Sequence, residues 1–224
     1  MDYALENNAV YAHAGWSPQA QADISRLGVN NINGIIGNDG VNFWRDSTYD
    51  RSYHNLYTSI QKLSEYAEDK KGYSLAGGKN LLKFLKTDTE PDGDECVSVD
   101  FRYSGGYRVG YTYNPETQMY ERYVNGKKHM SQTGNVLEAK NIIIYNVSNY
   151  DLNDGQGKGR QNLNNIGNGN GLYITMGKVQ EITWSKASRS EKTIYKTSDG
   201  EELSVNPGLT FIQIIPKGNS IDIK

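Results

Sequence analysis

The chain has 224 residues, with 24 lysines and arginines against 26 aspartates and glutamates, and a formal net charge of −2. This length allows one large domain or two small ones, and it is sufficient for a substantial hydrophobic core. The balanced charge gives no reason to expect a nucleic acid or an anionic membrane surface as a partner. The only cysteine, Cys96, excludes an intrachain disulfide and a cysteine-based zinc site.

The composition favours β-structure. The chain contains 17 tyrosines and 24 glycines, and tyrosine is enriched in strands while glycine marks turns. No run of about 18 apolar residues predicts a transmembrane helix. The first residues also lack the basic and apolar regions of a signal peptide.

The first part of the chain alternates helix and strand signals. Residues 1–7 read as the end of a helix, and Val10–His13 reads as a short strand. Ser17 suits the N-cap of a second helix, Pro18 suits its first position, and Gly28 suits its end.

Further along, Thr58 or Ser59 begins another amphipathic helix, which ends near Gly72. The pattern also predicts a short helical turn over Asn80–Leu85. Residues 87–95 are acidic and contain proline and glycine, so they read as a linker.

After residue 95 the apolar period changes from 3.6 to 2, which predicts an antiparallel meander followed by more strands. The glycine-rich stretches 155–160 and 167–171 match neither a dinucleotide-binding nor a phosphate-binding motif and are interpreted as turns. We therefore expect an α+β protein, with a mixed α/β module at 1–86, a linker at 87–95 and a mainly antiparallel β-rich module at 96–224.

His13 is the first candidate site residue, because it ends a predicted strand just before a helix start. Ligands of α/β layers bind at the carboxyl ends of strands, and free N–H groups at a helix start attract anions. Trp16 and Ser17 lie in the same turn. The alternative is that His13 bonds a nearby backbone group and Trp16 fills a gap in the core.

A second cluster follows at FWRD and YHNLYTS. Arg45 has a planar guanidinium group, which binds carboxylates and phosphates through paired hydrogen bonds. His54 and Asn55 precede another helix start. Convergence of His13, Arg45 and His54 would suit a polar or anionic ligand, or acid–base chemistry. Internal salt bridges and caps are the alternative. His129 is the third histidine, and the three lack the spacing of zinc ligands, so no metal or other cofactor is predicted.

YAHAGWSPQA, FWRD and HNLYTS, together with YNPETQMYERYVNGKKH and NPGLTFIQIIP, make the chain resemble the YerB-like family of bacterial lipoproteins. The resemblance covers nearly the whole chain. Trp16 replaces a glycine common in the family, and Tyr53 stands where proline is frequent. The family motifs map onto the following positions: His13, Ser17, Arg45, Asp46, His54, Asn55 and Tyr57.

The resemblance implies two modules and a bacterial protein outside the cytoplasmic membrane, membrane-anchored through a lipidated cysteine. This chain lacks that cysteine, and it also lacks the family's first strands. We therefore expect a start inside the family's first module. The family supplies no reaction that carries over to this chain.

Three functions remain open. The leading hypothesis is a cell-envelope protein that binds a glycan, a wall peptide or an anionic metabolite, with the β-rich module as an interaction face. The second is a hydrolase or transferase with His13 or His54 as general base and Arg45 as anion stabiliser. The third is a structural or assembly module. The expected ligand-binding residues are His13, Trp16, Ser17, Trp44, Arg45, Asp46, His54, Asn55 and Tyr57.

Overall fold

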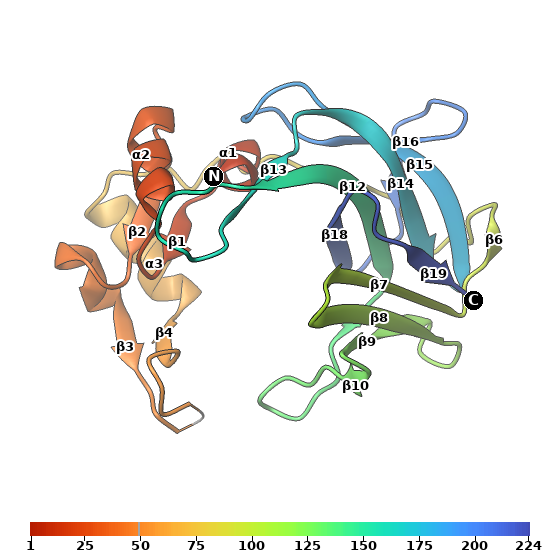
Figure 1. Ribbon diagram of the computed structural model, residues 1–224, viewed down its shortest axis with the longest axis horizontal. Helices are drawn as coiled ribbons and strands as arrows, with labels where there is room; N and C mark the ends of the chain where they lie inside the picture. Colours follow the sequence, from red (N-terminus) through yellow and green to blue (C-terminus); the bar gives the residue numbers. More distant parts are fainter. Residues whose placement is uncertain (49) are drawn as a thin grey trace. The chain divides into compact units, whose positions relative to one another are not determined.

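The computed structural model describes residues 1–48 and 50–224. The chain forms two compact units (Figure 1). Unit 1 contains residues 1–81 and the short segment 189–192, and unit 2 contains residues 82–188 and 193–224. The architecture is α+β, as predicted. Among the described residues no helix is both long and apolar enough to cross a membrane.

Unit 1 is built on a β–α–β element. Strands β1 (Tyr11–His13) and β2 (Asn31–Asn33) pair in parallel, and helix α2 (Pro18–Leu27) connects them. Ser17 Oγ accepts the N–H of Ala20 at 3.1 Å, and Gly28 ends the helix with φ of 64°. Both helix signals are confirmed, because the hydroxyl satisfies a free N–H and only glycine adopts the left-handed end without strain.

The other elements of unit 1 are short. Ser59 caps α3 by accepting the N–H of Lys62 at 3.3 Å, as the sequence predicts. Figure 1 shows the β3–β4 hairpin extending away from the helices of this unit. The remaining elements are α1 (Asp2–Glu6), the 3-10 helix η1 (Gly37–Asn42), β3 (Phe43–Arg45), β4 (Leu56–Thr58) and α3 (Ile60–Asp69).

Unit 2 contains two main sheets. In the first sheet, β7, β8 and β9 form the predicted antiparallel meander, and β10, β11 and β19 pair at its edges. Its strands are β7 (Ser98–Ser104), β8 (Tyr107–Asn114), β9 (Met119–Val124), β10 (Lys127–Lys128), β11 (Glu138–Ala139) and β19 (Ile221–Ile223).

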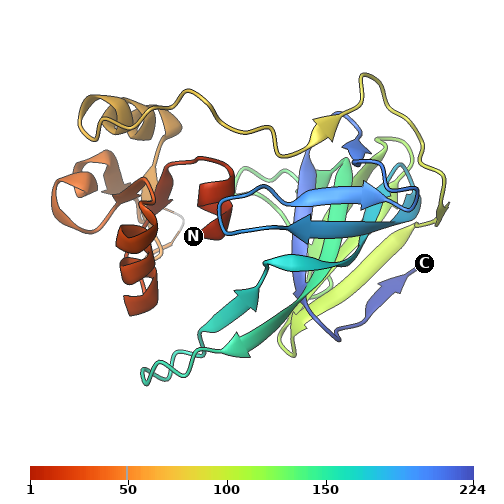
Figure 2. The ribbon, with the colours of Figure 1, turned by 90° about the horizontal axis from the view of Figure 1, so that it is seen from above.

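The second sheet is centred on the long strand β12 (Asn141–Asp151), which pairs with β13, β14 and β18. The pairing of β12 with β18 is parallel. In Figure 2 the end of β12 and β13 form a hairpin that extends beyond the other strands of this unit. The other strands are β6 (Asp94–Glu95), β13 (Gln161–Asn164), β14 (Gly167–Thr175), β15 (Lys178–Lys186), β16 (Ile194–Thr197) and β18 (Thr210–Pro216).

Alternation along β12 divides the core of unit 2 into two clusters. Ile142 and Ile144 face the first sheet, where they pack with Phe101, Tyr111 and other buried side chains. Ile143, Tyr145 and Val147 point to the opposite face and pack with Trp184. A strand buried on both faces reads as a continuous apolar run, which explains the sequence NIIIYNV.

Three expectations differ from the structure. Lys83–Phe84 is a strand, β5, that pairs in parallel with β17 (Ser204–Val205), so no helical turn forms over Asn80–Leu85. Residues 87–95, expected as a linker, lie in unit 2, where β6 pairs with β15. The stretch 167–171 is part of β14 rather than a turn. A Cβ on Gly171 would lie 2.7 Å from Ile144 O, so this glycine permits close packing of strands.

Cys96 is expected to be inert in the native protein. Its side chain is fully buried in the first cluster, and burial raises the pKa of its thiol to about 11. Since the thiolate is the reactive form, a disulfide thiol reagent at pH 8 should label Cys96 only in denaturant. Rapid stoichiometric labelling without denaturant would contradict this burial.

Candidate functional site

Unit 1 contains a cavity of about 270 Å³ beside the carboxyl ends of β1 and β2. Trp16 follows β1 and Asn33 ends β2, so the carboxyl ends of both strands of the β–α–β element contribute to its wall. Ligands of α/β layers commonly bind at this end of the strands. The lining residues are Trp16, Gln21, Ile24, Ser25, Asn31, Asn33, Ile36, Asp39 and Lys71.

Asn33 is the most buried polar residue of this lining, with 3% of its surface exposed. Its Oδ1 accepts the N–H of Gly15 at 3.1 Å and the N–H of Ile35 at 3.3 Å. These two bonds fix which end of the amide is the oxygen. The Nδ2 group is buried and has no partner, although buried polar groups are normally paired. An acceptor atom in the cavity would satisfy this donor.

Asp39 joins three elements of unit 1. Its carboxylate accepts the backbone N–H of Asn33 at 3.0 Å and the hydroxyl of Tyr66 at 3.0 Å, and it lies 2.9 Å from Lys71 Nζ. Burial alone would raise the pKa of Asp39. The N–H of Asn33 and the ammonium of Lys71 outweigh burial and lower it. The cavity therefore has a neutral ion pair in its wall rather than an isolated charge.

His13 makes polar contacts that stabilise the turn between β1 and α2. Its Nδ1 lies 2.7 Å from Gly15 O, and its Nε2 lies 3.1 Å from Asn31 Oδ1. The ring stacks on Tyr11 with centroids 4.8 Å apart and lies 5.6 Å from the ring of Trp16. Action as a general base would require His13 to give up one of these contacts. Trp16 keeps 36% of its surface exposed and offers a flat apolar face.

The second predicted cluster lies on the β3–β4 hairpin. Arg45 donates from Nη1 to Tyr53 O at 2.5 Å and to Asn55 Oδ1 at 2.9 Å. Trp44 and Tyr57 are opposite each other in the register of this hairpin. His54 is exposed, and its ring lies tilted against the ring of Tyr53 with centroids 4.2 Å apart. The hydrogen bonds of Arg45 therefore join the two sides of the loop in its own hairpin.

Asp46 also stabilises the loop of this hairpin. Its Oδ1 accepts the N–H of Thr48 at 2.8 Å, and contacts with Thr48 lower the pKa of Asp46. Neither Arg45 nor His54 lines the cavity beside Trp16. Among the described residues, no hydrogen bond, ion pair or ring contact joins the His13–Trp16–Ser17 group to this hairpin.

The third histidine, His129, lies in unit 2, where its Nδ1 accepts an N–H from Arg122. Burial and the charge of Arg122 lower the pKa of His129. In the described part of the chain, no group of three or more histidine, cysteine or acidic residues is arranged to hold a metal ion.

Sequence reasoning missed Asn33, Asp39 and Lys71, which line the cavity with Trp16. Asn31 and Asn33 alternate along a strand that follows a capped helix. A parallel β–α–β reading of residues 11–33 would have placed Asn33 at the carboxyl edge. Asp39 and Lys71 gave no such signal, because only tertiary packing brings them together.

Comparisons with known proteins agree over both units. Residues 1–74 match the N-terminal domain and residues 99–212 match the C-terminal domain of a protein of unknown function, DUF3048. The chain is also similar to the crystal structure of the YerB protein from Bacillus subtilis, with a TM-score of 0.80 and 28% identity. That match covers 98% of this chain and 73% of the YerB chain. Among proteins with curated functions, none matches.

Proposed function

The chain belongs to the YerB-like DUF3048 family, whose function is unknown, and from the geometry of unit 1 we propose that it binds a small polar ligand in the cavity beside Trp16. The observation that carries this proposal is the buried Nδ2 donor of Asn33, which has no partner. Leaving such a donor unpaired costs about 1–3 kcal/mol. A ligand that supplies an acceptor oxygen would recover that cost on binding.

The rest of the wall suggests the class of ligand. Trp16 offers a flat apolar surface, while Gln21 and Ser25 add polar groups. Because Lys71 is already paired with Asp39, the wall does not demand a charged ligand. A sugar combines acceptor oxygens with an apolar ring face, so we propose a saccharide unit as the ligand.

Asn33→Asp tests this proposal directly. The carboxylate keeps the acceptor for the N–H groups of Gly15 and Ile35 but removes the Nδ2 donor. Saturation-transfer NMR with N-acetylglucosamine and glucuronate as probes should show binding to the unchanged protein and at least tenfold weaker binding to the variant.

The matched control is Asn30→Asp, which adds the same charge just before β2 and outside the cavity lining. It should bind the probe as the unchanged protein does. Equal binding by Asn33→Asp, or no binding of either sugar by the unchanged protein, would contradict the proposed site. Thermal unfolding of each variant separates a lost contact from a lost fold.

We also propose that the protein works in the cell envelope, outside the cytoplasmic membrane. The support for this location is the sequence resemblance to the YerB-like lipoproteins. Cell fractionation of the full gene product tests it, and recovery in the cytosol alone would contradict it.

A further inference from the structure

The second sheet of unit 2 opens between β12 and β14. Strand β14 pairs with β15 from Gly167 onward, but with β12 only from Gly171 onward. Beyond Val147, β12 pairs with β13 instead. On β12, only residues 146 and 147 lie between the two paired regions, whereas on the other side six residues, 165–170, lie between them. Among the described strands, none pairs with the edge of β14 that faces β12 over residues 167–170.

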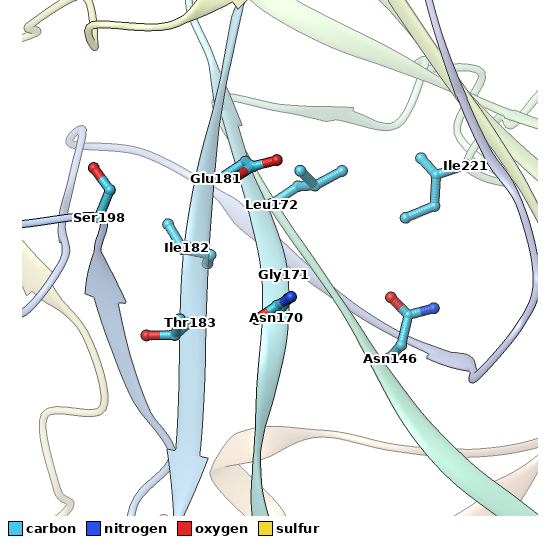
Figure 3. Close-up of a pocket in the computed structure, with 9 residues that line it drawn as sticks. All are labelled: Asn146, Asn170, Gly171, Leu172, Glu181, Ile182, Thr183, Ser198 and Ile221. Carbon is cyan, nitrogen blue, oxygen red and sulfur yellow. The ribbon is translucent and has the colours of Figure 1, made fainter. Parts of the chain in front are cut away.

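Two cavities of about 550 and 350 Å³ lie at this opening and share Asn146 and Asn170 in their walls. We call them together the sheet groove. Figure 3 shows the smaller part, in which Asn146 and Asn170 come from neighbouring strands and Glu181 lies near Leu172. In the larger part, Val147 and Trp184 belong to the opposite face of the sheet from Asn146. The groove therefore enters the gap between the strands.

Trp184 contributes an unpaired donor to the wall of the sheet groove. Its side chain is 3% exposed, and its Nε1 has no hydrogen-bond partner. A Cβ on Gly169 would lie 2.8 Å from this nitrogen. The glycine therefore leaves space beside the indole N–H that a larger residue would fill. A ligand oxygen entering from the larger cavity is the natural acceptor.

The two ends of the sheet groove have opposite charge. Glu181 lines the smaller cavity and Lys217 lines the larger one, and both are exposed. Neither makes an ion pair within residues 1–48 and 50–224. The strand register and ordinary sheet spacings place their Cα atoms roughly 20 Å apart. Both side chains are long enough to reach several ångströms toward a ligand that lies between them.

We propose that the sheet groove binds an extended peptide of about four residues, with its amino end toward Glu181 and its carboxylate toward Lys217. An extended chain rises about 3.3–3.6 Å per residue, so four residues span about 13–14 Å. The side chains of Glu181 and Lys217 would reach across the remainder of the roughly 20 Å between their Cα atoms. Its main chain would pair with the free edge of β14, as in strand addition. The side-chain amide of Asn170 and the Oδ1 of Asn146, whose Nδ2 donates to Pro216 O at 3.4 Å, complement peptide groups. A neutral glycan would leave both charges unused.

Tetra-alanine with free ends tests the proposal on the full chain. Titration followed by amide NMR should shift signals of β12 and β14, with binding in the millimolar range. N-acetylation of the peptide should weaken binding about threefold, and so should C-terminal amidation, because each removes one exposed ion pair. In Glu181→Gln the acetylated and free peptides should bind equally, whereas Glu116→Gln, a control in unit 2, should keep the difference.

Trp184→Phe tests the buried donor. Phenylalanine keeps an aromatic ring next to Tyr145 but removes the N–H, so tetra-alanine should bind about tenfold more weakly. Stability should not fall by the amount expected for a broken hydrogen bond, since none is present. Asn33→Asp should leave peptide binding unchanged, which separates this groove from the cavity of unit 1.

Equal binding of capped and free tetra-alanine would overturn the proposed orientation and the role of the two charges. Absence of β12 and β14 shifts at millimolar peptide would overturn the site itself. If an N-acetylglucosamine trimer shifts the amide signals of β12 and β14 but tetra-alanine does not, the ligand is a glycan and the peptide assignment is overturned.

Discussion

Asp39→Ala is expected to lower the free energy of unfolding of unit 1 by about 3 kcal/mol. The change removes the acceptor for the N–H of Asn33 and for the hydroxyl of Tyr66, and it leaves Lys71 without its partner. Fluorescence-detected denaturation in a Trp184→Phe background isolates this unit, because the two other tryptophans, Trp16 and Trp44, lie in unit 1.

Asp69→Ala is the matched control, since Asp69 is exposed at the end of α3 and its loss should change stability by less than about 0.5 kcal/mol. Similar losses in the two variants would contradict the role of Asp39 as a junction. The pKa of Asp39 is lowered in the folded state. Its contribution is therefore complete above the ordinary carboxyl pKa and is lost as the pH falls through the folded value. In Asp39→Asn, the free energy of unfolding should depend less on pH in that acid range.

Gly171→Ala is expected to destabilise unit 2 by about 2–3 kcal/mol. The new Cβ would lie 2.7 Å from Ile144 O and 3.1 Å from Tyr145 Cβ. A backbone oxygen within a paired strand cannot move without disturbing the pairing of β12 with β14. Chemical denaturation followed by near-ultraviolet circular dichroism, which reports the packing of the tyrosines, measures the loss.

Gly105→Ala is the control for that prediction. A Cβ on Gly105 would have no heavy atom within 4 Å, and its φ is not positive. The added methyl should therefore change stability by less than about 1 kcal/mol. An equally small effect at Gly171 would mean that the two strands can separate slightly without cost.

The local elements could largely be predicted from the sequence. Ser17, Pro18 and Gly28 define α2 because each satisfies a requirement of a helix end. The alternating residues of β7 and β8 likewise predict the meander. The stretch 167–171 was misread because its glycines and asparagines are typical of turns, and only the packing of Ile144 and Trp184 against it explains glycine in a strand.

The candidate site was only partly predictable for a related reason. Trp16 was recognised from its place after a strand, but two of its neighbours in the cavity, Asp39 of the 3-10 helix and Lys71 just after α3, come from later parts of the chain. Arg45 and His54 drew attention as types that often act on ligands. In the structure the guanidinium of Arg45 bonds Tyr53 and Asn55 of its own hairpin, and a contact of Arg45 with a ligand stays a prediction.

The parallel pairing of β12 with β18 has a consequence for how unit 2 forms during synthesis. Asn141 pairs with Thr210, and Phe101 pairs with Ile221. In each sheet, therefore, one strand is synthesised long before the strand it pairs with. Until those strands emerge from the ribosome, one edge of β12 and one edge of β7 are open to other chains. Pairing between such distant segments predicts slow folding, and aggregation of nascent chains should depend on how quickly the last strands arrive.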